Sequence, residues 1–178
     1  PASMIYVVSA PAVTKDGHEL GSLCAQAQER LDEVTALNGT QRGSVAARMQ
    51  HRELSTKNTG LSTTVYAVNA GYFENHYEQL LCGRLVSESD ISRAQRVIIL
   101  DENAALALFS ESAPLGRALL LDGATYEVAG VIRGGRRIGE ADGYVAYIPL
   151  TAADQMAMQA DTVELTAPAC EDMGQSIL

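Results

Sequence analysis

The sequence predicts an α+β fold, because its apolar residues follow a helical spacing in one part of the chain and a strand spacing in others. From Leu20 to Leu37 they recur every three or four positions, which predicts one long helix with a single buried face. The segment ALLLDGATYEVAGVI, residues 118–132, predicts two strands joined at Asp122 and Gly123, a pair that tolerates the positive φ of a tight turn. At 178 residues the chain is long enough for one domain, or for one domain with an inserted lobe.

The first seventy residues predict a strand, the long helix and a β-hairpin. The stretch MIYVVSA, residues 4–10, is rich in β-branched and aromatic residues and predicts a short strand that ends at Pro11. The segments 44–56 and 61–70 both alternate between apolar and polar residues, so we expect them to pair as a hairpin. In the first of these segments the alternating residues are Val45, Ala47, Met49 and His51.

The middle of the chain predicts a short helix, a buried strand and a second helix. In the segment 71–84, aromatic and leucine residues have helix-like spacing until Gly83 interrupts it: Tyr72, Phe73, Tyr77, Leu80 and Leu81. The run VIIL, residues 97–100, predicts a buried strand. Asp101 is then placed to cap the N-terminus of a helix over residues 102–109.

The remainder of the chain alternates between connectors, strands and helices. Thr151 is placed to cap the helix that follows it, and Pro168 suits the first turn of a last helix. In order, we expect a glycine-rich mobile connector over 133–143, a strand over 144–149, a helix over 152–159, a strand over 162–167 and the last helix.

The charge of the chain argues against nucleic acid as a partner. Its formal net charge is -9, and only Arg133, Arg136 and Arg137 form a basic cluster. A surface that binds phosphates needs many clustered lysine and arginine side chains to displace counterions. We therefore expect no nucleic-acid partner.

The cysteines and the apolar runs specify neither a metal site nor a membrane span. Cys24, Cys82 and Cys170 are far apart, odd in number and without CxxC spacing, so they predict neither a zinc site nor a disulfide framework. No apolar run approaches the ~18 residues that a membrane-spanning helix needs. Because position 1 is Pro1 rather than methionine, we expect a processed product or a segment of a longer protein.

The motifs that would bind a nucleotide or a metal ion do not occur in the sequence. There is no GxxxxGK[ST] loop for phosphates, and Gly134, Gly135 and Gly139 fit no dinucleotide fingerprint. The three histidines, His18, His51 and His76, lack the HExxH spacing or any other ligand spacing. We therefore expect no cofactor-binding residues and no metal-binding residues.

One arrangement could be imagined as a catalytic site. Cys82 would be the nucleophile, His76 the base and Glu74 the group that orients the base. All three lie in one short segment, and such separations rarely bring these groups into the required geometry. We therefore expect no catalytic residues and no enzymatic activity.

The stretch CGRLVSESD, residues 82–90, places a thiol, a guanidinium and two carboxylates within nine positions. Gly83 supplies backbone freedom for a turn, and Arg84 can donate to nearby carbonyls or carboxylates. Asp90 can accept backbone N–H groups and close the loop before the next strand. We expect a scaffold loop, with contact to a partner protein as the alternative.

Four segments of the chain also carry a specific order of motifs: VNAGYFENHYEQLLCGRLVSESD, RVIILDENAALALF, APLGRALLLDGATYEVAGVI and YVAYIPL. In this order they resemble the extracytoplasmic core domain of MacB-type, FtsX-like ABC transporter permeases. That family has a "YF" turn, a "GR…D" loop and a strand leading into a helix that ends "LF". A "P-[IL]-G" motif, a hairpin and a strand ending in proline follow.

The resemblance implies a two-lobed α+β domain. Residues 1–70 together with 151–178 would form a porter-like βαβ lobe, and residues 71–150 an inserted smaller α+β lobe. It also implies localisation to the cell membrane. The domain would lie on the extracytoplasmic side, between the first and second transmembrane helices of the permease. No functional residue is transferred from the family.

The resemblance further implies the function and the partners. It describes a non-catalytic domain that transmits ATP-driven conformational change to export or signalling outside the membrane. Its partners would be the transmembrane helices of its own permease chain, a cytoplasmic ATPase module, a second permease in a homodimer and an envelope adaptor protein. The alternative is a binding module that senses or captures a peptide or lipid ligand.

Overall fold

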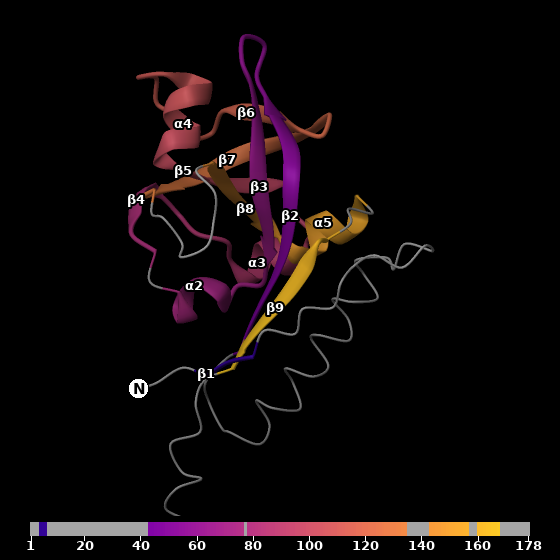
Figure 1. Cartoon of the computed structure of the whole chain (residues 1–178). Coiled ribbons are helices and arrows are strands. Elements are labelled where there is room, and N and C mark those ends of the chain that lie inside the picture. The colour runs from indigo at the N-terminus through magenta and orange to yellow at the C-terminus, as the bar shows by residue number, and fades with distance from the viewer. Residues whose placement is uncertain (1–3, 7–42, 77, 135–142, 157–159, 168–178) are drawn as a thin grey trace, which may run out of the picture.

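The computed structural model describes residues 4–6, 43–76, 78–134, 143–156 and 160–167, and within these ranges it contains one mixed sheet of nine strands (Figure 1). The strands are β1 (Met4–Tyr6), β2 (Ser44–Ser55), β3 (Gly60–Val68), β4 (Leu80–Gly83), β5 (Val97–Asp101), β6 (Ala118–Leu121), β7 (Ala124–Ile132), β8 (Tyr144–Pro149) and β9 (Thr162–Ala167). The helices in these ranges are α2 (Tyr72–Asn75), α3 (Glu88–Ser92), α4 (Glu102–Phe109) and α5 (Leu150–Gln155).

Six of these strands close into a ring, which we call the strand ring. Around it, β2 pairs with β3, β3 with β8, β8 with β5, β5 with β7 and β7 with β6. The ring is completed where β6 returns to β2, with Leu54 opposite Leu121 and Ser55 opposite Leu120. The strands β1 and β9, which we call the terminal strand pair, extend the sheet from the outer edge of β2, and β4 extends it from β7.

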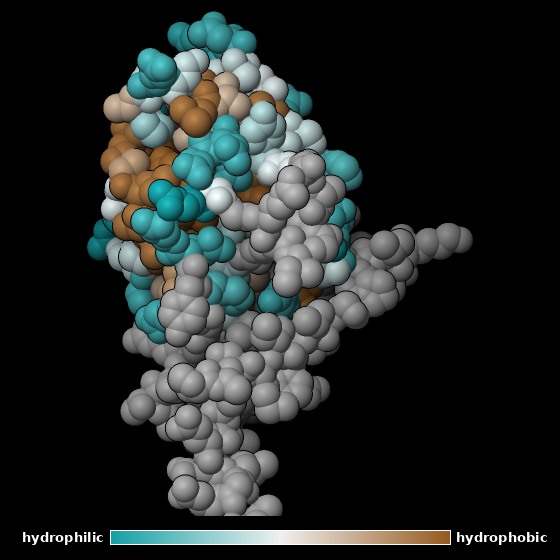
Figure 2. Space-filling model, turned by 60° about the vertical axis from the view of Figure 1, so that its left-hand side comes forward, coloured by the Kyte–Doolittle hydropathy of each residue, from teal (hydrophilic) through white to brown (hydrophobic). Residues whose placement is uncertain are grey.

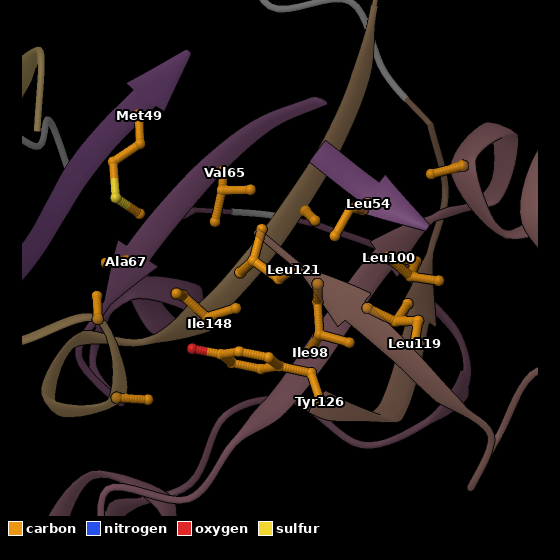
Figure 3. Close-up of a cluster of buried hydrophobic side chains, with 14 of the residues drawn as sticks. Met49, Leu54, Val65, Ala67, Ile98, Leu100, Leu119, Leu121, Tyr126 and Ile148 are labelled. Atoms are coloured by element: carbon orange, nitrogen blue, oxygen red, sulfur yellow. The ribbon is translucent and has the colours of Figure 1, made fainter. Parts of the chain in front are cut away.

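The interior of the strand ring is the main hydrophobic core. Alternate residues of each strand point inward, so the side chains converge from all around the ring (Figure 3). Helix α4 contributes Ala104, Leu108 and Phe109 to the same cluster, and α5 contributes Ala152 and Ala153. The labelled residues of the ring are Met49, Leu54, Val65, Ala67, Ile98, Leu100, Leu119, Leu121, Tyr126 and Ile148.

A second hydrophobic cluster lies on the outer face of the ring and is covered by the segment that contains α2 and α3. The residues between the inward-pointing ones contribute to it, because successive side chains of a strand point to opposite faces. Tyr66 stacks on Tyr147 with the ring centroids 5.5 Å apart, and Tyr72 of α2 lies 5.6 Å from Tyr147. The buried members of this cluster are Ala46, Tyr66, Val68, Tyr72, Val86, Ile99, Ile132 and Tyr147.

Several local predictions are confirmed. Asp122 and Gly123 form the turn between β6 and β7 with φ of 47° and 86°, the positive values that the sequence predicted. Asp101 caps α4, accepting the N–H of Ala104 at 2.6 Å. The expected hairpin is β2 with β3, and the strands expected over 97–100, 144–149 and 162–167 are β5, β8 and β9.

Three local predictions are wrong. Leu80 and Leu81 do not continue a helix but begin β4, because pairing with β7 outweighs their helix-like spacing. Their side chains are 39% and 40% exposed. Thr151 does not cap α5, which begins at Leu150, and its hydroxyl donates to the carbonyl of Ile91 at 2.7 Å. His51 does not continue the alternation of Met49, because a β-bulge interrupts β2 there.

The fold class is α+β, as predicted, and the strand ring takes strands from both expected lobes. Strand β3 lies in residues 1–70 and β8 in residues 71–150, yet the two pair in parallel from Thr63 to Val68. The division into a porter-like lobe and an inserted lobe at 71–150 stays a prediction, and this pairing does not support its boundaries. The helices expected at 20–37 and from Pro168, and most of the connector at 133–143, lie outside the described residues.

Candidate functional site

The loop of residues 82–90 begins where β4 and β7 approach each other closely. Gly83 has a φ of 75°, and a Cβ atom built there would lie 2.2 Å from the carbonyl oxygen of Ala129. A Cβ atom at Gly130 would likewise lie 2.2 Å from the carbonyl oxygen of Arg84. Because only glycine fits both positions, the two backbones come into contact and the N–H of Arg84 donates to Ala129 at 2.9 Å. The chain then leaves β4 in a fixed direction.

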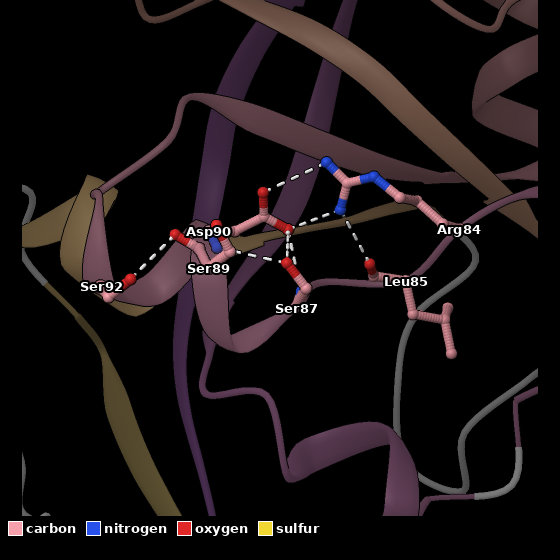
Figure 4. Close-up of polar contacts among 6 residues, drawn as sticks. All are labelled: Arg84, Leu85, Ser87, Ser89, Asp90 and Ser92. Carbon is pink, nitrogen blue, oxygen red and sulfur yellow. Dashed lines mark hydrogen bonds and ion pairs between the residues drawn. The ribbon is translucent and has the colours of Figure 1, made fainter.

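Arg84 and Asp90 form a bidentate ion pair that closes the loop (Figure 4). Nη1 of Arg84 donates to Oδ2 of Asp90 at 2.6 Å, and Nη2 donates to Oδ1 at 3.1 Å. The same guanidinium donates to the carbonyl of Leu85 at 3.2 Å. The predicted contacts of Arg84 with a carbonyl and a carboxylate are therefore confirmed.

Asp90 also forms the capping box of α3. Its Oδ2 accepts the N–H of Ser87 at 2.8 Å and the hydroxyl of Ser87 at 2.9 Å, while Oγ of Ser87 accepts the N–H of Asp90. The predicted backbone N–H contact of Asp90 is therefore confirmed. A serine three positions before an aspartate was the sequence signal for this cap.

The protonation states of the pair follow from these contacts. Burial of Asp90 would raise the pKa of its carboxyl, but the hydrogen bonds from Arg84 and Ser87 outweigh it and hold that pKa below its usual range. The hydrogen bond to Asp90 raises the pKa of Arg84 above its already high usual value. Asp90 is buried and Oδ2 already accepts three donors, so the carboxylate has little capacity left for an ion or a ligand. This supports a scaffold role.

The imagined catalytic group of Cys82, His76 and Glu74 is not assembled. Cys82 lies in β4, pairs with Val131 and packs against the core of the strand ring. The His76 ring instead stacks on Tyr72 at 4.0 Å, with Nδ1 2.9 Å from the Tyr72 carbonyl oxygen. Nε2 of His76 faces Oε1 of Glu164 at 3.8 Å. Both ring nitrogens are thus turned toward groups other than the thiol.

The surroundings of Glu78, in the same region, shift the pKa of its carboxyl. Burial raises the pKa of the Glu78 carboxyl, although its hydrogen bond with the Tyr147 hydroxyl at 3.4 Å and the charge of His76 act in the opposite direction. The Tyr147 side chain that donates to it is itself buried. The group therefore joins the segment after α2 to β8.

The other residues considered for metal or phosphate lie apart. His51 is exposed in the bulge of β2, and the backbone N–H of Arg133 extends the pairing of β7 by donating to Gln79 at 2.8 Å. Within the described ranges, no group of three or more His, Cys, Asp or Glu residues is arranged to hold a metal ion. His18, Cys24, Arg136, Arg137 and Cys170 lie outside the described residues.

Exposed apolar side chains lie on β4 and beside it, and also on α4 and β6. Figure 2 shows apolar surface gathered on one side of the molecule, between polar side chains. The large hydrophobic residues that are exposed in the described part of the chain are Leu80, Leu81, Leu106, Leu115 and Leu120. Leu115 packs against Gly83, since its Cδ2 lies 2.6 Å from where a Cβ of Gly83 would be. No described helix is long and apolar enough to cross a membrane.

Comparison with protein families identifies the family of this domain. Residues 3–175 match the MacB-like periplasmic core domain. The chain belongs to this family. It is therefore an extracytoplasmic domain of a MacB-like ABC transporter permease, which confirms the resemblance seen in residues 68–150 and extends it to almost the whole chain.

The chain spans less than a fifth of the length of the curated relatives described here. The chain is 31% identical over 99 residues to the macrolide export ATP-binding/permease protein MacB of Neisseria gonorrhoeae, covering 55% of this chain and 15% of that protein. It is 30% identical over 70 residues to the uncharacterized ABC transporter permease YknZ of Bacillus subtilis, covering 39% of this chain and 18% of that protein.

Solved structures share the fold of this MacB-like domain. The periplasmic region of MacB from Actinobacillus actinomycetemcomitans superposes with a TM-score of 0.70 at 19% identity, covering 84% of this chain and 67% of that one. The extracellular domain of YknZ, a noncanonic ABC-type transporter from Gram-positive bacteria, superposes with a TM-score of 0.73 at 17% identity. That match covers 98% of this chain and 88% of the other.

Sequence reasoning missed the acidic residues that fasten β9 to the rest of the domain. Asp161 accepts the N–H of Gln50 at 2.6 Å, and Glu164 faces His76. Neither residue belongs to a motif, and their partners are distant in sequence. A signal for the bulge beside Asp161 was present, because the inward residues of β2 change from odd positions at Met49 to an even position at Leu54.

Proposed function

We propose that this domain has no catalytic role and transmits ATP-driven conformational change from the membrane part of an ABC permease to export or signalling outside the membrane. The arrangement of its first and last described strands supports this proposal. Met4 lies opposite Ala167 and Ile5 opposite Thr166, so β1 and β9 pair side by side at one end of the sheet. A displacement of one of these strands therefore reaches the domain together with the other.

The path from the chain ends into the strand ring is continuous. β9 pairs with β2 from Ser44 to Arg48, and β2 runs on past this point to join β6 and close the ring. At the far end of the molecule from β1, β2 and β3 project as a hairpin (Figure 1). Because backbone hydrogen bonds connect each strand to the next, a movement of the terminal strand pair is passed to the strand ring.

The partners follow from this role. Transmembrane helices of the same permease chain would move the terminal strand pair, and a cytoplasmic ATPase module would move those helices. A second permease in a homodimer and an envelope adaptor protein would receive the movement outside the membrane. A net charge of -9 is unfavourable for nucleic acid.

The proposal is tested in the full-length permease with flexible linkers. A Gly-Ser linker is inserted before Met4 and a second one after Ala167, so that the domain stays attached but no longer follows its connections. We expect ATP hydrolysis to continue while ATP-dependent export or signalling is lost. The same linker placed after Ser112, in the exposed loop between α4 and β6, lengthens a loop outside this path and should leave coupling intact.

The alternative role, in which the domain captures a peptide or lipid, predicts a different result. Flexible linkers would then leave ligand affinity and export largely unchanged, since binding does not need a rigid connection. Saturable thermal stabilisation of the isolated domain by a peptide or a lipid would favour this alternative. Export that survives both terminal linkers would reject the transmission role.

A further inference from the structure

A β-bulge divides β2 into two halves. Met49 pairs with Val65 and Arg52 pairs with Thr63, so two residues of β2, Gln50 and His51, lie opposite a single residue of β3. His51 has a φ of 56°, which is uncommon for a residue with a side chain. An extra residue of this kind bends a strand and increases its local twist.

The bulge preserves the core while it bends the strand. Met49 and Leu54 are five positions apart, and in a regular strand they would point to opposite faces. Both are fully buried in the strand ring, because the extra residue restores the inward direction. Removing His51 would leave the two side chains pointing inward as well, since their separation would become four. The bend is therefore separable from the packing.

The outer edge of β2 changes its neighbour across the bulge. Before the bulge, Ser44 to Arg48 pair with β9 of the terminal strand pair. After the bulge, Leu54 and Ser55 pair with β6, which closes the strand ring. The bulge thus lies where the part of β2 that pairs with the terminal strand pair meets the part that closes the ring.

Two aspartate side chains bridge the gap between β9 and β6 on this edge. Oδ2 of Asp161, the residue before β9, accepts the N–H of Gln50 at 2.6 Å. Oδ1 of Asp122, in the turn after β6, accepts the N–H of Glu53 at 3.0 Å, and its Oδ2 pairs with Arg52 at 3.2 Å. At Gln50 and Glu53 the N–H groups on this edge donate to side-chain carboxylates, which can release them to water. In the paired parts of the edge the N–H groups donate to backbone carbonyls instead.

We propose that the Gln50–His51 bulge is a joint that sets the angle between the terminal strand pair and the strand ring, and that Asp161 latches this joint. The inference rests on the proposed function for its purpose, because a joint at this point governs how far a movement of the chain ends displaces the hairpin tip. The geometry of the joint itself does not depend on the permease. It can be measured in this chain alone.

The test measures distances between spin labels in the 178-residue chain with its three native cysteines replaced by alanine. The first label pair is Lys57→Cys in the hairpin tip with Thr162→Cys on β9 of the terminal strand pair. The second pair is Lys57→Cys with Leu106→Cys on α4, which packs against the ring. The first pair reports the angle across the joint and the second reports the ring.

Each variant has a defined expected effect. Deletion of His51 should shift the mean distance from tip to β9, because the bend is lost, and should leave the distance from tip to α4 unchanged. Asp161→Ala should broaden the tip-to-β9 distribution without shifting the second pair. Asp154→Ala removes an exposed carboxylate of α5 that takes no part in the joint and serves as the matched control.

Three results would overturn the proposal. An unchanged tip-to-β9 distance after deletion of His51 would mean that the bulge does not set the angle. A distribution in Asp161→Ala no broader than in Asp154→Ala would mean that Asp161 is no latch. A change in the tip-to-α4 distance as well would mean that the variants disturb the whole ring. If instead the joint behaves as expected while the terminal linkers leave export intact, only the transmission role is rejected.

Discussion

The carboxylate of Asp101 accepts the backbone N–H of Val145 at 2.8 Å, across 44 residues of sequence. The other oxygen of the same carboxylate caps α4 through Ala104. One buried side chain therefore ties together the end of β5, the start of α4 and the start of β8. These are three of the elements that enclose the core of the strand ring.

Replacement of Asp101 by asparagine should destabilise the domain by about 1–2 kcal/mol at neutral pH, because the amide group would turn a donor toward one of the two N–H groups. Burial raises the pKa of the Asp101 carboxyl and outweighs the hydrogen bonds from Ala104 and Val145. The folded protein therefore holds this proton more tightly than the unfolded chain. Its stability should fall as the pH rises above about 3.9, the usual aspartate value.

Urea unfolding at a series of pH values measures this effect. In Asp101→Asn the decrease in stability above about pH 3.9 should be smaller than in the wild type, since the titrating group is gone. Asp154→Asn, an exposed carboxylate of α5, is the control and should keep the wild-type profile. A profile of Asp101→Asn that follows the wild type at every pH would contradict the role of Asp101.

Replacement of Arg84 by methionine should destabilise the domain by about 1–2 kcal/mol at pH 7, a value reduced by the exposure of half of the Arg84 side chain. The loss arises because the buried carboxylate of Asp90 keeps only its contacts with Ser87. The folded pKa of Asp90 lies below its usual value, so this stabilisation is present above that value and is lost as the pH falls through the folded pKa. The difference between wild type and variant should shrink accordingly.

Equilibrium unfolding of four proteins separates the pair from its parts: the wild type, Arg84→Met, Asp90→Asn and the double variant. The coupling between the two side chains is the departure of the double variant from additivity. Arg84→Lys is an informative control, because it keeps the charge and loses the two parallel hydrogen bonds. A coupling of zero at pH 7 would show that the loop is held by the capping box alone.

Features that depend on neighbouring residues could be predicted from the sequence, and features that depend on distant ones could not. The turn at Asp122 and Gly123 and the cap at Asp101 follow from local chemistry, because positive φ and a free helix N-terminus favour particular residue types. The contacts of Arg84 and Asp90 were predictable for the same reason, since both residues lie in one loop.

The closure of the strand ring shows the limit of this reasoning. Leu54 and Leu121 lie opposite each other across 67 positions, and nothing in either segment identifies the other. Leu80 and Leu81 had a spacing that fits helix and strand alike, and only pairing with β7 decided between them. The expected lobes were defined by ranges of sequence. Hydrogen bonds between β3 and β8, which are far apart in the sequence, join residues 1–70 to residues 71–150.

Ser110, which follows α4, has a backbone conformation that favours glycine. Its φ is 55° and its ψ is -131°, a combination that is strained for a residue with a Cβ atom. Ser110→Gly should therefore stabilise the domain by about 1 kcal/mol, because the relief of strain exceeds the extra entropy of glycine in the unfolded chain. The hydrogen bond from the N–H of residue 110 to Leu106 is kept in the variant.

The midpoint of thermal unfolding measures this prediction. Ser110→Ala keeps a Cβ atom and removes only the hydroxyl, so it should unfold close to the wild-type temperature. A stabilisation shared by the alanine and glycine variants would point to the hydroxyl rather than to the backbone. A glycine variant less stable than the wild type would contradict the prediction that the backbone of Ser110 is strained.

Gly83 and Gly116 offer a matched pair for testing the close approach of β4 and β7. Their φ values are 75° and 76°, but a Cβ atom at Gly83 would lie 2.2 Å from Ala129 whereas one at Gly116 would have nothing within 4 Å. Alanine at either position pays about 1 kcal/mol for the left-handed backbone. Only Gly83→Ala must also push β4 away from β7, so it should cost about 3 kcal/mol or more.

The difference between the two variants isolates the contact, because the backbone cost is common to both. Urea unfolding gives each free energy, and Gly60→Ala, in open space at the start of β3, shows the effect of an added methyl group alone. Since Arg84 follows Gly83 directly, a displaced β4 would also carry its guanidinium away from Asp90. The loss in Gly83→Ala should then be less than additive with Arg84→Met, and full additivity would mean that the glycine contact and the ion pair hold the loop independently.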